Sequence, residues 1–129
     1  MEKYYLGLDL GGTKILTGLA DSDGNIITRS RRDTEAELGE DKIIENMIAT
    51  VEDVIEKTGV SKEQIITLGI GSPGPLDSKK GIIIENANLP WKNVPLVERM
   101  ESALGIKTLL QNDANAAALG EKWFKEKKN

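Results

Sequence analysis

Residues 4–14 read Tyr-Tyr-Leu-Gly-Leu-Asp-Leu-Gly-Gly-Thr-Lys, and the expected fold is built outward from this stretch. The apolar run over residues 4–10 predicts a strand, and the Gly-Gly pair that follows predicts a tight turn. A second strand is expected from Ile15 to Ala20 and a third from Asn25 to Arg31, with another glycine turn between them. Three strands joined by such short turns predict an antiparallel meander.

Beyond the meander the sequence alternates between helix and strand patterns. Residues 41–58 place their apolar side chains on one helical stripe, and Gly59 follows as a C-terminal cap. The later elements expected are a strand over 65–71, loop over 72–95 with a short strand at 81–85, a helix between Pro95 and Gly105, a strand over 106–110 and a helix from 113 to about 125. The order βββαβαβα predicts an α/β fold with a mixed five-stranded sheet and helices on its faces.

Composition limits the classes of function. The 129 residues contain no Cys and no His, so disulfides are excluded and acid–base chemistry at neutral pH falls to carboxylates, Lys or Tyr. A net charge of -4 argues against nucleic acid or anionic lipid as a partner. No apolar run has the length of a membrane span and no signal peptide is recognisable, so we expect a cytoplasmic protein with a single domain.

The first polar segment that could carry chemistry runs from Asp9 to Lys14. Gly11 and Gly12 allow a ligand to approach the backbone and its N–H groups, while Thr13 adds a hydroxyl and Lys14 a cation. This loop could cradle phosphate oxygens, and Asp9 could hold Mg²⁺ directly or through water. A glycine-rich hairpin with an Asp turn residue explains the same residues without any ligand.

The second segment is Gly69-Ile70-Gly71-Ser72-Pro73-Gly74-Pro75, followed by Asn86-Ala87-Asn88-Leu89-Pro90-Trp91. The first part ends an apolar strand, where open α/β sheets bind their ligands. The amides of Asn86 and Asn88 suit hydrogen bonds with hydroxyl groups. A strand stop made of Pro and Gly, followed by an Asn turn, is the alternative interpretation.

The third segment is Gln111-Asn112-Asp113-Ala114-Asn115-Ala116-Ala117-Ala118. Asp113 follows a strand and precedes a helix, which is a usual position for a helix N-cap. The functional interpretation makes Asp113 a general base held rigidly by a helix that packs closely through its alanines. A carboxylate base, hydroxyl-binding amides and a phosphate loop together are the parts needed for phosphoryl transfer to an alcohol.

On these residues the sequence resembles the ROK family of repressors, open reading frames and sugar kinases, and especially its bacterial glucokinases. The matching pieces are Leu8-Asp9-Leu10-Gly11-Gly12-Thr13-Lys14, Gly69 to Pro75, Asn88-Leu89-Pro90-Trp91 and Asn112-Asp113-Ala114-Asn115-Ala116-Ala117, in the family's order and spacing. The resemblance covers nearly the whole chain but only the N-terminal lobe of a family member. It implies an actin-like, RNase H-like ATPase fold.

The resemblance also implies a role for each matching residue. Asp113 would deprotonate the sugar hydroxyl that attacks the γ-phosphate of ATP, and Asp9 would help to position Mg²⁺. The residues implied to contact the hexose are Gly74, Pro75, Asn88, Asn112 and Asp113. Those implied to face the ATP phosphates are Gly11, Gly12, Thr13 and Lys14. Glucose is the favoured hexose.

The C-terminal lobe of the family is expected to be absent. That lobe brings the adenosine pocket and a Cys/His zinc motif, and a chain without Cys or His cannot provide the zinc site. The first strand of this chain begins near Tyr4, so we also expect no DNA-binding helix-turn-helix ahead of that strand. The leading hypothesis is therefore the sugar-binding lobe of a glucokinase, incomplete alone. The alternatives are a non-catalytic sugar-sensing module and a half-domain that forms a homodimer through its exposed cleft face.

Overall fold

The computed structural model describes residues 2–86 and 88–112, and all structural statements below concern those residues. The predicted helix from 113 to about 125, which includes the candidate base Asp113, lies outside them.

The main sheet has five strands in the order β3-β2-β1-β4-β8. Their bounds are β1 Tyr4–Leu10, β2 Lys14–Asp21, β3 Ile26–Asp33, β4 Ile65–Ser72 and β8 Thr108–Asn112. The first three strands pair antiparallel, whereas β4 runs parallel to β1 and β8 runs parallel to β4. The predicted meander, the parallel later strands and the mixed five-stranded sheet are thus confirmed.

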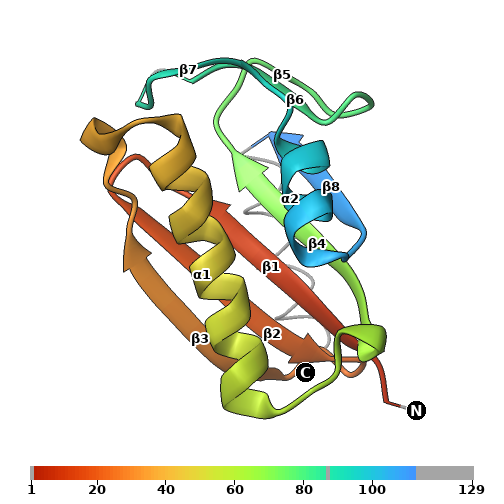
Figure 1. Ribbon diagram of the computed structural model, residues 1–129. Coiled ribbons are helices and arrows are strands. Elements are labelled where there is room, and N and C mark those ends of the chain that lie inside the picture. The colour runs from red at the N-terminus through yellow and green to blue at the C-terminus, as the bar shows by residue number, and fades with distance from the viewer. Residues whose placement is uncertain (1, 87, 113–129) are drawn as a thin grey trace.

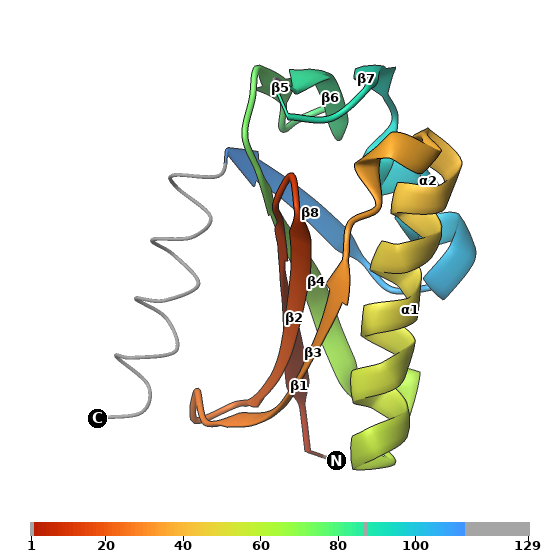
Figure 2. The ribbon, with the colours of Figure 1, turned by 90° about the vertical axis from the view of Figure 1, so that its left-hand side faces the viewer.

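Two helices cover one face of this sheet, as Figure 2 shows. They are α1 (Glu40–Thr58) and α2 (Leu96–Leu104). A short 3-10 helix, η1 (Ala36–Leu38), precedes α1, and a second one, η2 (Lys62–Gln64), lies between α1 and β4. Helix α1 buries the stripe Ile43, Met47, Val51 and Val54, whose spacing of three or four residues keeps these side chains on one side. Gly59 ends α1 with φ 71°, and its N–H donates to the carbonyl of Ile55, as the cap prediction required.

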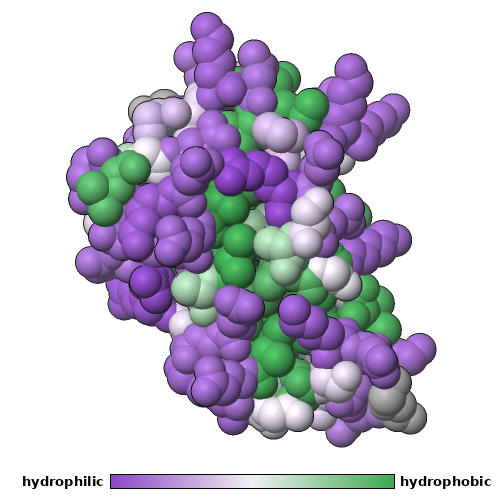
Figure 3. All heavy atoms as spheres, viewed as in Figure 1, coloured by the Kyte–Doolittle hydropathy of each residue, from purple (hydrophilic) through white to green (hydrophobic). Residues whose placement is uncertain are grey.

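The core lies between the helices and the sheet. Leu6, Leu8 and Leu10 of β1 are buried on the helix side, while the intervening Asp9 is exposed and therefore faces away from α1. One polar pair is buried in this core, because the hydroxyls of Thr17 and Thr50 lie 2.8 Å apart and satisfy each other. From the helix side, apolar surface is visible in a strip that runs between α1 and α2 (Figure 3).

The segment after β4 corrects one expectation. Residues 72–95 were expected to be mostly loop, but they contain a second, three-stranded sheet of β5 (Leu76–Asp77), β6 (Ile82–Asn86) and β7 (Trp91–Val94) in that order. Such short strands are too brief to show a period of two, which is why the sequence pattern revealed only a short strand near 81–85. This small sheet lies above the upper edge of the main sheet in Figure 1.

No helix within the described ranges combines the length and the apolar character that crossing a membrane requires.

Candidate functional site

The candidate residues converge at one edge of the main sheet. Strands β1, β4 and β8 are parallel neighbours, so their carboxyl ends meet at the same edge. The register aligns Asp9 with Gly71 and Ser72 with Asn112, so three of the sequence segments end side by side. The small sheet β5-β6-β7 lies over this edge (Figures 1 and 2).

The turn between β1 and β2 is tight, and Gly11 is required in it. The N–H of Gly11 donates to the carbonyl of Lys14 at 3.0 Å. A Cβ added to Gly11 would lie 2.8 Å from that carbonyl oxygen, closer than real Cβ atoms approach such a group. A side chain at position 11 would therefore force the backbone of the turn to shift. Asp9 lies at its entrance as an exposed carboxylate.

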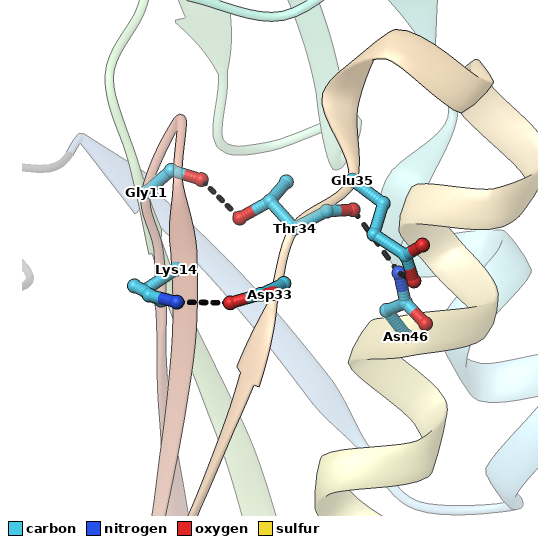
Figure 4. A network of polar contacts seen from close by, with 6 residues as sticks. All are labelled: Gly11, Lys14, Asp33, Thr34, Glu35 and Asn46. Carbon is cyan, nitrogen blue, oxygen red and sulfur yellow. Dashed lines mark hydrogen bonds and ion pairs between the residues drawn. The ribbon is translucent and has the colours of Figure 1, made fainter.

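Strand β3 and the residues after it brace this turn, as Figure 4 shows. Lys14 forms an ion pair with Asp33, and this ammonium group lowers the pKa of the Asp33 carboxyl from its ordinary value. Thr34 donates from its hydroxyl to the carbonyl of Gly11 and from its N–H to the carbonyl of Thr13, both at 2.8 Å. The turn is thus tied to β3 at three points.

The loop between β6 and β7 presents Asn88 to the turn. Asn86 is buried, and its Nδ2 donates to Ser72 Oγ at 3.3 Å while its Oδ1 accepts from the N–H of Asn88 at 2.8 Å. A Cβ added to Gly12 would lie 2.8 Å from the Cβ of Asn88. Asn86 therefore has the turn role that the sequence left open. Asn88 is exposed, and its side chain is held against Gly12.

The third meeting point joins the end of β8 to the loop after β4. A Cβ added to Gly74 would lie 3.1 Å from Nδ2 of Asn112, so this glycine gives the amide room. The Gly74–Pro75 peptide bond is cis, and Pro75 is exposed. An open pocket of about 500 Å³ lies beside them, lined by Leu76, Ser78, Leu109, Leu110, Gln111 and Asn112.

The structure therefore brings four of the predicted site residues together in two contacts, Gly12 with Asn88 and Gly74 with Asn112. Thr13 is exposed at the turn, and the Lys14 ammonium is directed to Asp33. Asp113 lies outside the described residues. Across residues 2–86 and 88–112, no three or more His, Cys, Asp or Glu side chains are grouped to hold a metal ion.

Sequence reasoning missed the supporting residues Thr34 and Asn46. Asn46 is a polar residue on the buried face of α1, between the apolar Ile43 and Met47, and that conflict with the apolar stripe could have marked it. Thr34 carries no comparable signal, because it follows a charged strand end and its burial depends entirely on the turn from β1.

Comparison with known proteins gives a consistent result. The model of the ROK family matches residues 5–129. The glucokinase of Thermotoga maritima is 42% identical over 120 residues, which cover 92% of this chain and 36% of that protein. The xylose repressor of Caldicellulosiruptor bescii is 31% identical over 94% of this chain and 30% of that protein. The chain thus spans about a third of the length of these relatives.

Solved structures agree with the sequence relatives. The ROK family glucokinase from Streptomyces griseus, solved in complex with glucose and AMPPNP, matches with a TM-score of 0.82 and 32% identity over 94% of this chain and 36% of that one. The ROK hexokinase from Thermus thermophilus matches with a TM-score of 0.78 and 37% identity over 92% of this chain and 38% of that one. These likenesses confirm the expected actin-like ATPase fold.

Proposed function

This chain belongs to the ROK family, and from that premise we propose that it forms the sugar-binding and catalytic lobe of an ATP-dependent hexose kinase. Glucose, converted to glucose 6-phosphate, is the proposed substrate. The chain spans about a third of its relatives' length, so the remaining parts of a complete site are expected from a further lobe.

One observation carries this proposal. The turn proposed to bind phosphate and the amides proposed to bind the sugar touch each other, because Asn88 is held against Gly12. Phosphoryl transfer requires the attacking hydroxyl and the γ-phosphate to be aligned a few ångströms apart. A turn that packs at Gly12 against the side chain of Asn88 is consistent with that requirement and supports the proposal.

The proposed roles follow from position at the carboxyl edge. Asp113, directly after β8, is proposed as the base that accepts the proton of the sugar hydroxyl as transfer advances. The residues proposed to contact the sugar are Gly74, Pro75, Asn88 and Asn112. Gly11, Gly12, Thr13 and Lys14 are proposed to face the phosphates of ATP.

The exposed carboxylate of Asp9 suits Mg²⁺ better than it suits a metal ion that several protein ligands must enclose. Mg²⁺ keeps several waters and takes its other ligands from substrate phosphates, so one carboxylate beside a phosphate loop is enough. When bound there, the ion would neutralise charge that develops on the transferring phosphoryl group.

The direct test is a coupled assay of glucose-dependent ATP turnover by the purified 129-residue chain, with Asp113→Ala as the control. We expect no turnover, because the second lobe is needed to enclose ATP, and glucose binding that calorimetry detects. Asn112→Ala should weaken this binding about tenfold, as expected when a hydrogen-bonding group is removed from a polar site. Asn25→Ala, in the distant β2–β3 turn, should leave it unchanged. Equal glucose binding by the unmodified chain, Asn112→Ala and Asn25→Ala would contradict the assignment of Asn112 to the sugar site.

A second candidate function is a sugar-sensing module without catalysis. It is favoured by the 31% identity to the xylose repressor of Caldicellulosiruptor bescii. The two candidates differ in their need for Asp113, since a sensor requires no base. In the complete protein, loss of turnover in Asp113→Asn with sugar binding retained would support the kinase. Sugar binding without any ATP turnover by the unmodified protein would support the sensor.

A further inference from the structure

We propose that Thr34 is a positioning residue that sets the conformation of the Gly11–Lys14 turn for phosphate binding. No motif marks this residue, and it is placed to act through the turn rather than to touch a ligand itself. The inference rests on the proposed phosphate-binding role of that turn.

Thr34 donates two hydrogen bonds to the backbone of the turn. Its hydroxyl donates to the carbonyl of Gly11 at 2.8 Å (Figure 4). Its N–H donates to the carbonyl of Thr13, also at 2.8 Å. Thr34 has no exposed surface. Both donors are therefore shielded from water, although Gly11 is half-buried and Thr13 is exposed, so these bonds are stronger than the same bonds between fully exposed groups.

The direction of the turn's backbone groups matters for phosphate binding. Carbonyl oxygens repel the oxygens of phosphate, whereas N–H groups attract them, so a phosphate turn must direct its carbonyls elsewhere. Thr34 holds two of the turn's carbonyls, those of Gly11 and Thr13, through hydrogen bonds. Because the C=O and N–H of one trans peptide point in opposite directions, anchoring the Gly11 carbonyl turns the N–H of Gly12 away from Thr34.

Thr34 is itself fixed from helix α1. The Nδ2 of Asn46 donates to the carbonyl of Thr34 and to Oε1 of Glu35, both at 3.1 Å. Its Oδ1 accepts from Nε of Arg32 at 2.8 Å. Arginine can only donate, and a carbonyl and a carboxylate can only accept, so the orientation of this buried amide is unambiguous.

The backbone immediately after Thr34 is also unusual. Glu35 has φ 58° and ψ 46°, the left-handed region that residues other than glycine rarely enter. Glu35 lies where the chain passes from β3 into η1, directly after the carbonyl that accepts from Asn46. The cost of that conformation is offset by the hydrogen bonds around it, as is common where a structure holds a functional element in place.

The test compares three threonine variants of the 129-residue chain. Thr34→Val keeps the shape of the side chain but removes the donor to Gly11, and Thr34→Ser keeps the donor. Thr58→Val is the matched control, because Thr58 also donates from its hydroxyl to backbone carbonyls, at the far end of α1. The readout is the ATP-induced shift of the Gly11 and Gly12 amide signals, titrated with ATP in the presence of Mg²⁺.

We expect Thr34→Val to raise the dissociation constant for ATP about tenfold, because the half-buried Gly11 carbonyl loses its partner and the turn loses its anchor. Thr34→Ser should restore most of the affinity, and Thr58→Val should bind as the unmodified chain does. Rescue by serine separates a positioning role from a general loss of stability, which the circular dichroism melting curve of each variant reports.

Two other outcomes overturn the inference in distinguishable ways. If the unmodified chain responds to ATP at Gly11 and Gly12 and Thr34→Val responds with the same affinity, Thr34 has no positioning role and the proposed function survives. If those amides of the unmodified chain do not respond to ATP, the phosphate-binding role of the turn fails, and the role of Thr34 fails with it.

A second variant keeps the test decisive if Thr34→Val does not fold. Glu35→Ala removes the half-buried carboxylate that accepts from Asn46 Nδ2, and it leaves the backbone cost unchanged because alanine is also a non-glycine residue. We expect it to weaken ATP binding two- to threefold through the loosened Asn46 amide. Unchanged affinity in a folded Glu35→Ala chain would count against the network.

Discussion

At the scale of single residues, Gly12 is the point where the two halves of the proposed site touch. The Cβ of an alanine there would lie 2.8 Å from the Cβ of Asn88, so one of the two segments must move. We expect Gly12→Ala to weaken both ATP and glucose binding about tenfold, because the displaced Asn88 and the displaced turn lose their alignment together. Titration calorimetry with each ligand measures the two effects separately.

Gly18→Ala is the matched control for this change. An added Cβ at Gly18 meets nothing closer than 3.9 Å, which is ordinary contact. A loss of binding in Gly18→Ala equal to that in Gly12→Ala would mean that an added methyl group disturbs the β1–β2 hairpin wherever it is placed, and that the contact with Asn88 is not the cause.

A second residue-scale prediction concerns pH. The backbone N–H of Asn25 is the main group that lowers the pKa of Asp21 below its ordinary 3.8, with the N–H of Asp23 and the side chain of Asn25 adding to it. The carboxylate therefore stabilises the folded chain above about pH 4, and this contribution is lost as the pH falls through the lowered pKa. Urea unfolding between pH 6 and pH 2 measures it.

Asp21→Asn separates this contribution from general acid unfolding. Its amide oxygen still accepts from two N–H groups, but its amide nitrogen cannot accept from the Asn25 side chain. We expect the variant to be less stable near neutral pH and the difference from the unmodified chain to shrink toward pH 2. A difference that stays constant over the whole range would show that ionisation of Asp21 has no role.

At the scale of elements, the small sheet is docked on α2 through Gly81. This glycine has φ 69°, its carbonyl accepts from the N–H of Val97 at 3.1 Å, and an added Cβ would lie 2.4 Å from the Cβ of Val97. We expect Gly81→Ala to lower the free energy of unfolding by about 2–4 kcal/mol, through strain at positive φ and through overpacking.

Gly105 is an unusually close control for that prediction. It also has φ 69°, but nothing lies within 4 Å of an added Cβ. Gly105→Ala should therefore cost only about 1 kcal/mol, the backbone part of the effect. If the two variants lose equal stability in urea unfolding, the small sheet is not held by the contact between Gly81 and Val97.

The elements also differ in how well sequence reasoning could find them. Helix α1 and strands β1 to β4 were predictable because each carries a long enough pattern, apolar every three to four residues or in continuous runs. Strand β6 was expected as the short strand at 81–85, but β5 and β7 were not, since they are only two and four residues long and the small sheet that they form with β6 docks on α2. Tertiary contacts, rather than local pattern, specify that sheet.

At the scale of the whole molecule, the convergence of the candidate segments was predictable because parallel strands place their carboxyl ends at one edge. The segments after β1, β4 and β8 were each ambiguous alone, and their shared position supported a common role. The supporting shell was not predictable. Thr34 and Asn46 are far from the motifs in sequence, and their side chains meet the turn only after α1 has packed on the sheet.

The last prediction concerns association of whole chains. The two lobes of an actin-like fold resemble each other, so the face that meets a second lobe could instead meet a copy of this one. We propose that Leu109 belongs to that face, because it is 46% exposed and lines the pocket beside Asn112. We expect sedimentation to give an apparent mass that rises with concentration, and Leu109→Lys to return the monomer, because a buried ammonium group opposes the contact. Leu38→Lys is the control, because Leu38 lies in η1, is 57% exposed and does not line that pocket. We expect Leu38→Lys to leave the association unchanged. A monomer mass at every concentration would contradict self-association and leave a second lobe as the only way to complete the proposed kinase site.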